Sequence, residues 1–226
     1  MLNKIKLELE QLAAKGLLRQ LKPVQSRKDG CVEVRGKQLI DFTNWDYLAL
    51  NSNRDFLTSL QREIESLGVG ACAARTASGT HQRHVACEYR IAQFLNTQSS
   101  ILFSSKNQAV LSLVTSLVAE GDLVFLDETM HSPVSDAAYL VNAQAIYYHA
   151  GSLAQLKSEL SKCKPTLRKF IFAESISPVT GIGTDLGYLV ELARTFKAQL
   201  IVDESYALAA LGLRGAGGRE PARARA

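Results

Sequence analysis

The sequence predicts an α/β fold with a mostly parallel sheet that is covered by helices on both faces. Short β-branched apolar runs alternate with amphipathic helical patterns from about residue 84 onward, and the connections between them are short. Such alternation is typical of parallel sheets that are buried on both faces. The composition, 46% hydrophobic and 21% charged over 226 residues, is that of an ordinary globular protein with one large core.

The first fifty residues are expected to form an N-terminal segment of one helix and one hairpin. Apolar residues recur at helical spacing over residues 3–21, and Pro23 follows this run. Two short apolar runs, residues 31–35 and 38–42, are separated by Gly36 and predict a β-hairpin.

The elements of the main domain are expected within residues 51–213. The predicted helices are residues 54–67, 84–95, 108–119, 132–141, 153–161 and 186–197. The predicted strands are residues 100–103, 123–126, 144–148, 168–172 and 199–202. Residues 214–226 contain four arginines and no apolar residue larger than alanine or proline, which predicts a disordered basic tail.

Charge and cysteine usage argue against several classes of function. The expected tail carries +3 of the net charge of +4, so the body is near neutral and nucleic-acid binding has little electrostatic support. The four cysteines are scattered without metal-ligand spacing, so we expect neither a metal site nor disulfides. No membrane span of about 18 apolar residues and no signal-peptide pattern is visible, which predicts a cytoplasmic protein.

Asp203 is the most informative single residue, because it ends a short apolar run that is typical of a buried strand. Ligands of open α/β sheets bind outside the carboxyl ends of the strands, where this carboxylate would lie. From the run alone, a helix N-cap or an acid in a surface turn is at least as good an interpretation.

Five motifs together resemble those of the α-oxoamine synthase family of fold-type I pyridoxal-phosphate enzymes. This family includes 8-amino-7-oxononanoate synthase, glycine C-acetyltransferase and serine palmitoyltransferase. The motifs are D-F-T-N-W-D-Y-L-A-L from Asp41, G-V-G-A-C-A-A-R from Gly68 with Gly79, His84 and Glu88 after it, D-E-T-M-H-S from Asp127, E-S from Glu174, and V-D-E-S-Y from Val202. The resemblance covers about residues 41–217 and concerns the N-terminal portion of these enzymes.

The resemblance implies an incomplete large domain of fold type I and pyridoxal 5'-phosphate as cofactor. This cofactor acts as an electron sink when a carboxylate keeps its ring nitrogen protonated, and the resemblance assigns that role to Asp203. It assigns the catalytic, ring-stacking role to His131. The other cofactor-binding residues that it implies are Lys106 and Asn107 at the phosphate, Tyr206 at the phenolic oxygen, and Ser177.

Several of these assignments have plain structural alternatives. His131 could serve only as a hydrogen-bonding residue at a helix N-terminus, and Lys106 could be a solvated surface lysine. Tyr206 stands where the family has a histidine and remains uncharged near neutral pH. His84 and Glu88, four residues apart on one helix, are expected to form a structural pair.

The family holds its cofactor on a lysine that follows the aspartate, whereas this sequence has no lysine after Lys197. The family's C-terminal small domain is not recognisable either. We therefore expect a truncated or frameshifted chain that is inactive as written.

Three hypotheses for function follow. The first is the N-terminal part of an acyltransferase that condenses an amino acid with an acyl-CoA or acyl-carrier thioester with loss of carbon dioxide, and that is a homodimer in its intact form. The second is an aminotransferase-like enzyme with the same cofactor. The third is a non-catalytic remnant or partner subunit. The sequence identifies neither the amino acid nor the acyl chain.

Overall fold

A computed structural model describes residues 2–130, 133–149 and 151–218 of the chain. The chain divides into two compact units, Met1–Val69 and the part from Gly70 onward. The division falls after Val69, whereas the sequence predicts that the N-terminal segment ends at residue 50. Each unit is described by itself below.

The first unit contains a helix, a small antiparallel sheet and a second helix. These elements are α1 (Leu2–Ala14), β1 (Ser26–Lys28), β2 (Cys31–Val34), β3 (Lys37–Ile40), the 3-10 turn η1 (Leu50–Ser52) and α2 (Arg54–Leu67). The sheet order is β1-β2-β3, so the predicted hairpin is confirmed and gains an edge strand. Arg35 and Gly36 form its turn with φ of 52° and 72°, as the right-handed twist of a two-residue hairpin requires.

Helix α2 begins and ends at the residues that the sequence predicts, because both of its ends are capped. The side chain of Asn53 accepts a hydrogen bond of 2.9 Å from the backbone N–H of Phe56. At the other end Gly68, with φ of 76°, leaves the helical conformation. Helix α1, in contrast, ends seven residues before the predicted Leu21, and Gly16 with φ of 67° follows it.

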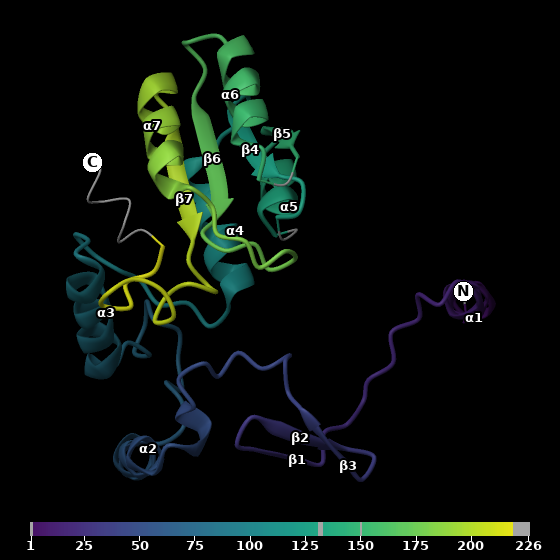
Figure 1. The fold of residues 1–226 in the computed structure, drawn as a ribbon. Helices are drawn as coiled ribbons and strands as arrows, with labels where there is room; N and C mark the ends of the chain where they lie inside the picture. The colour runs from purple at the N-terminus through teal and green to yellow at the C-terminus, as the bar shows by residue number, and fades with distance from the viewer. Residues whose placement is uncertain (1, 131–132, 150, 219–226) are drawn as a thin grey trace. The chain divides into compact units, whose positions relative to one another are not determined.

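The second unit is built on a parallel sheet of four strands in the order β5-β4-β6-β7 (Figure 1). The strands are β4 (Leu123–Asp127), β5 (Gln144–Tyr148), β6 (Lys169–Glu174) and β7 (Gln199–Asp203). Each neighbouring pair is parallel, so all four carboxyl ends lie at the same edge of the sheet. The α/β fold with a parallel sheet is therefore confirmed.

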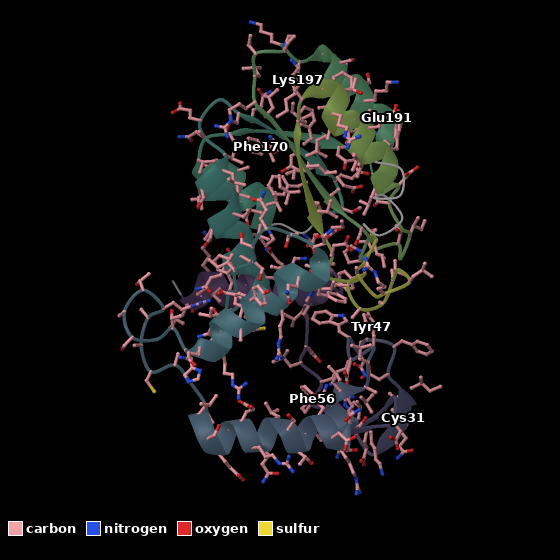
Figure 2. All side chains as sticks on the ribbon, turned by 90° about the vertical axis from the view of Figure 1, so that its left-hand side faces the viewer. Cys31, Tyr47, Phe56, Phe170, Glu191 and Lys197 are labelled. Atoms are coloured by element: carbon pink, nitrogen blue, oxygen red, sulfur yellow. The ribbon has the colours of Figure 1, made fainter. Side chains whose placement is uncertain are left out.

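Helices cover both faces of this sheet. The helices of the second unit are α3 (Gln82–Leu95), α4 (Lys106–Leu117), α5 (Pro133–Leu140), α6 (Leu153–Lys162) and α7 (Leu186–Phe196). Because successive strand residues point to opposite faces, β6 directs Phe170 and Phe172 toward α4 and α5, and Ile171 and Ala173 toward α6 and α7. All four side chains are buried, whereas Glu191 on α7 is exposed (Figure 2). Each face of the sheet thus has its own apolar core.

The predicted strand at residues 100–103 is wrong. Among the described residues this segment pairs with no strand, and it is held instead by Glu88 of α3. The Ser100 hydroxyl donates to the Glu88 carbonyl at 2.7 Å, and the Leu102 N–H donates to the Glu88 carboxylate at 2.9 Å. An apolar run forms a strand only where a neighbouring strand offers a ladder, and here a side chain supplies the acceptor instead.

The predicted disorder from residue 214 onward does not hold for Arg214 to Gly218. The Ala209 N–H donates to the Gly215 carbonyl at 2.7 Å, and the Gly218 N–H donates to the Glu204 carboxylate at 3.0 Å. Residues 219–226 lie outside the described residues. In the part of the chain that is described, no helix is both long and apolar enough to cross a bilayer, and no group of three or more histidine, cysteine or acidic side chains is placed to hold a metal ion.

Candidate cofactor pocket

Two acidic side chains end neighbouring strands on the α4 face of the sheet. Glu174 is the last residue of β6, Asp203 is the last residue of β7, and the two are partners in the parallel register. They share their side-chain direction with Phe172 and Ile201, which belong to the core on the α4 face. Asp127 also ends a strand, but its side chain shares the direction of Leu123 and Phe125 and so points to the opposite face of the sheet. The sheet therefore presents one pair of carboxyl groups beside α4.

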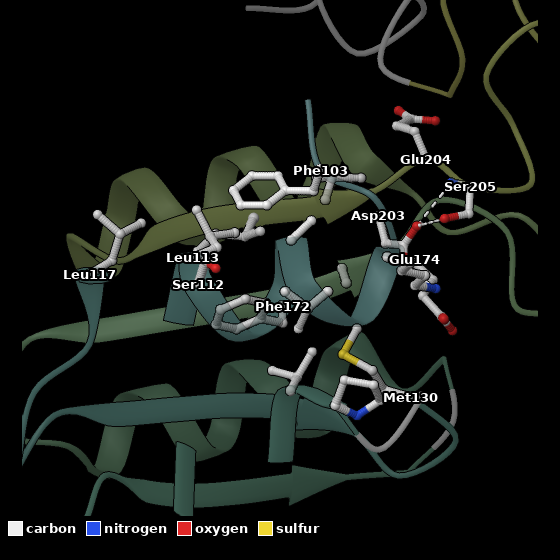
Figure 3. Close-up of a pocket in the computed structure, with 18 of the residues that line it drawn as sticks. Phe103, Ser112, Leu113, Leu117, Met130, Phe172, Glu174, Asp203, Glu204 and Ser205 are labelled. Atoms are coloured by element: carbon white, nitrogen blue, oxygen red, sulfur yellow. Dashed lines mark hydrogen bonds and ion pairs between the residues drawn. The ribbon is translucent and has the colours of Figure 1, made fainter. Parts of the chain in front are cut away.

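A pocket of about 770 Å³ opens at this position (Figure 3). Its apolar wall comes from α4, from the segment before α4 and from the sheet, with Ile101, Phe103, Val110, Leu113, Phe172 and Ile201 among the lining residues. Its polar end is formed by Lys106, Glu174, Asp203, Glu204 and Ser205. The volume lies within the range of small-molecule sites, and a mostly apolar wall with a few convergent polar groups is typical of them.

Asp203 is held as a carboxylate by three donors. The backbone N–H and the hydroxyl of Ser205 donate to its Oδ1 at 2.9 and 2.5 Å, and the ammonium of Lys106 lies 2.5 Å from its Oδ2. Burial alone would raise the pKa of Asp203. The bonds from Lys106 and Ser205 outweigh burial and lower the pKa below its ordinary value. This acid therefore carries a full negative charge at neutral pH.

Glu174 has the opposite electrostatic character. It is buried, and among the described residues its Oε1 has no hydrogen-bond partner. Burial, followed by the negative charge of Asp203, raises the pKa of Glu174 to about 7, and the nearby Lys106 only partly offsets this. A carboxyl group with this pKa can take up or release a proton near neutral pH.

Local capping places Lys106 at the pocket. Ser105 is the N-cap of α4, and its hydroxyl accepts a hydrogen bond from the N–H of Gln108 at 3.2 Å. Lys106 is therefore the first residue of the helix, at the end that faces the polar part of the pocket. Its predicted role at a phosphate remains a prediction, since in the structure its ammonium binds Asp203.

The other predicted site residues that the structure describes do not line the pocket. Asn107 and Tyr206 follow Lys106 and Ser205 directly in the chain, but neither is among the described residues that line the pocket. Ser177 lies in a turn where its hydroxyl accepts hydrogen bonds of 3.3 Å from Val179 and Thr180. His131 lies outside the described residues.

His84 attracts Glu88 electrostatically, as expected of this pair, but it is not the main partner of Glu88. Glu88 instead binds Arg75, with Nη1 2.5 Å from Oε1, and accepts a hydrogen bond from Leu102. These two partners, with a smaller contribution from His84, lower the pKa of Glu88 to about 2. His84 accepts a hydrogen bond from the N–H of His81 at the start of α3. Glu88 therefore anchors the segment that leads into α4.

Sequence reasoning missed Glu174 and Ser205 as site residues. The signal for Glu174 was available, because an acid that directly follows a buried apolar run is the same pattern that identified Asp203. The parallel alternation of elements places both acids at one edge. Ser205 had only a local signal, since a serine two residues after an aspartate commonly hydrogen-bonds to it in a turn.

The side chains that are present fit a planar ring with a protonated nitrogen. Asp203 already binds a cationic N–H donor, which shows that it can pair with a ring N–H⁺. Val110, Phe172 and Ile201 supply apolar surface for a ring. The N-terminus of α4, with its backbone N–H groups and the positive end of the helix dipole, favours an anionic substituent such as a phosphate.

Known proteins are similar to this chain over most of its length. Residues 37–222 match the family model for aminotransferase class I and II. A serine palmitoyltransferase from Sphingobacterium spiritivorum is 29% identical over 92% of this chain and 52% of its own length. An 8-amino-7-oxononanoate synthase from Pelobacter propionicus is 31% identical over 94% of this chain and 54% of its own length.

Solved structures agree with the fold. The serine palmitoyltransferase of Sphingomonas wittichii superimposes with a TM-score of 0.86 at 24% identity, covering 98% of this chain and 56% of that one. An 8-amino-7-oxononanoate synthase from Francisella tularensis gives a TM-score of 0.67 at 27% identity, covering 80% of this chain and 50% of that one. The chain thus spans about half the length of the relatives that it matches.

Proposed function

The chain belongs to the aminotransferase class I and II family, and from this premise we propose that its second unit carries the pyridoxal 5'-phosphate pocket of an α-oxoamine synthase-like acyltransferase. The observation that carries the proposal is the ionised Asp203 at the carboxyl end of β7, bound to a cationic donor inside an apolar pocket. The relatives that are named serine palmitoyltransferase and 8-amino-7-oxononanoate synthase support the class of reaction.

The cofactor, when bound, supplies an electron sink for negative charge that develops on the substrate carbon. In this proposal Asp203 holds the proton on the ring nitrogen, and the two bonds from Ser205 fix the direction of its carboxylate. The first turn of α4 receives the phosphate, and Asn107 and Tyr206 stay candidates for further cofactor contacts. Glu174 can hold or release a proton beside the ring, because its pKa lies near neutrality.

The test of this pocket is a calorimetric titration of the full chain with pyridoxal phosphate. We expect saturable binding to the parent chain and about tenfold weaker binding to Asp203→Asn, since one charge-assisted hydrogen bond is lost. Asp136→Asn, which removes an exposed carboxylate from α5, is the matched control and should bind as the parent does. Equal affinity for Asp203→Asn and the parent would contradict the pocket.

For the whole protein we propose the decarboxylative condensation of an amino acid with an acyl-CoA or acyl-carrier thioester. The sequence given has no lysine after Lys197, and Lys106 is the one lysine among the described residues that line the pocket. We therefore propose that this chain by itself binds the ring without turnover. Release of free CoA thiol from acyl-CoA in the presence of glycine, alanine or serine, above the rate without protein, would contradict this.

A second candidate reaction is transamination, which the description of the matching family favours. Product analysis separates the two reactions, since transamination yields a 2-oxo acid and condensation yields an aminoketone with carbon dioxide. We also propose a homodimer and a cytoplasmic location for the intact protein. Sedimentation of the intact protein at the monomer mass would contradict the dimer.

A further inference from the structure

Lys106 closes the acidic end of the pocket. Both oxygens of Asp203 are engaged, Oδ1 by Ser205 and Oδ2 by the Lys106 ammonium. Neither partner of the ion pair is fully exposed, with 37% of the Lys106 side chain and 24% of the Asp203 side chain accessible to solvent. A ligand that brings a cationic donor to Oδ2 would place two positive charges on one carboxylate oxygen, and their repulsion favours displacement of the ammonium.

Glu174 offers a place for the displaced ammonium. It is the register partner of Asp203, it lines the same pocket, and its buried Oε1 has no partner among the described residues. Lys106 already lies within electrostatic reach of this carboxyl group. Since a lysine carries three donors on a flexible four-carbon stem, it can exchange one carboxylate for a neighbouring one without movement of the backbone.

We propose that Lys106 determines which ligands occupy the pocket: it yields Asp203 only to a ligand that brings its own protonated nitrogen, and Glu174 receives it. A neutral ring has no donor that could replace the ammonium on Asp203, so it leaves the ion pair in place. A cationic ring replaces one charge-assisted hydrogen bond with another, and the displaced ammonium satisfies the buried oxygen of Glu174. The identity of this ring rests on the proposed function, whereas the exchange between the two acids is a property of the chain without ligand.

The exchange can be measured without any ligand. The full chain is treated with acetic anhydride, and acetylation of Lys106 is followed by peptide mass spectrometry relative to Lys157, which is exposed on α6. In Asp203→Ala we expect the rate at Lys106 to stay within about threefold of the parent, because Glu174 takes over the ammonium. In Asp203→Ala/Glu174→Leu we expect an increase of about tenfold, because the ammonium then has neither of its two carboxylate partners in the pocket.

A tenfold increase in the acetylation rate of Lys106 in Asp203→Ala alone would overturn the exchange, because it would show that Glu174 offers the ammonium no second position. Circular dichroism confirms folding of each variant. If the leucine variant is unfolded, Glu174→Gln takes its place, and the same order of rates is expected.

The second measurement concerns the ligand. We expect Lys106→Met to bind pyridoxal phosphate about tenfold more tightly than the parent, because no ion pair has to be opened. Glu174→Gln should weaken binding when Lys106 is present and have no effect in the Lys106→Met background, as a double-mutant cycle reports. Equal or weaker binding by Lys106→Met overturns the proposal and assigns Lys106 to the phosphate. If no form of the chain binds pyridoxal phosphate, the proposed function fails, while the acetylation rates still decide the role of Lys106.

Discussion

Glu174 and Asp203 are register partners at the ends of neighbouring strands, yet their pKa values shift in opposite directions. Burial acts on both carboxyl groups. At Asp203 the donors from Lys106 and Ser205 outweigh it, whereas Glu174 has no such donor on Oε1 among the described residues. The pocket thus combines a permanent carboxylate with a carboxyl group that titrates near neutral pH.

The titration of Glu174 predicts a pH dependence of stability. Folding raises its pKa from 4.5 to about 7, so the folded state holds this proton more tightly than the unfolded state does. The resulting stabilisation is complete below pH 4.5 and is lost as the pH rises through about 7. Relative to Glu174→Gln, the free energy of unfolding of the parent should fall by up to roughly 3 kcal/mol over this window.

Urea denaturation of the parent and of Glu174→Gln at the two ends of this window measures the effect. Since the charged neighbours of Glu174, namely Asp203, Lys106 and Asp127, are present in both proteins, their contributions largely cancel in the difference. A difference in unfolding free energy that does not change with pH would show that Glu174 is not buried as described.

A second prediction concerns the anchor between Glu88 and the segment that precedes α4. Removing the charge in Glu88→Gln should speed hydrogen exchange at the Leu102 amide by about tenfold or more, because a hydrogen bond to a charged group is weakened. Folding lowers the pKa of Glu88 from 4.5 to about 2, so in the parent the anchor is present above pH 4.5 and is lost as the pH falls toward 2. Glu120→Gln, at an exposed position, is the control and should leave the Leu102 amide unchanged.

A third prediction concerns Gly79, where the backbone approaches too closely for a side chain. A Cβ at this position would lie 1.9 Å from the carbonyl oxygen of Ala73. Gly79→Ala should therefore lower the free energy of unfolding by roughly 1–3 kcal/mol, because the loop must shift. Gly70→Ala meets no atom within 4 Å and serves as the control in the same urea titration. Equal stability of the two variants would contradict this local geometry.

Much of the fold could be predicted because its signals are local. Strand β5 and helix α2 have the predicted bounds. Strands β4 and β7 end one residue later than predicted, and β6 begins one residue later and ends two residues later. Buried apolar runs and helix caps are encoded within a few residues, so they are visible in the sequence. Strand β1 was missed because Ser26–Lys28 is a short polar edge strand without apolar alternation.

The candidate site was predictable only in part. Asp203 is marked by its position after an apolar strand, but the bond from Lys106 joins residues that are far apart in the sequence, and no local pattern encodes it. That the Glu174 Oε1 has no hydrogen-bond partner in the described part of the chain likewise depends on packing. The strand expected at residues 100–103 failed for the same reason, because a ladder needs a neighbour that the local sequence does not specify.

The protonation state of the bound ring nitrogen tests the central claim most directly. Pyridoxal phosphate labelled with ¹⁵N in the ring can be bound to the full chain, and the nitrogen chemical shift then reports whether the nitrogen carries a proton. The account predicts a protonated ring nitrogen near neutral pH in the parent and loss of that proton in Asp203→Asn. An unprotonated nitrogen in the parent, or the same shift in both proteins, would contradict it.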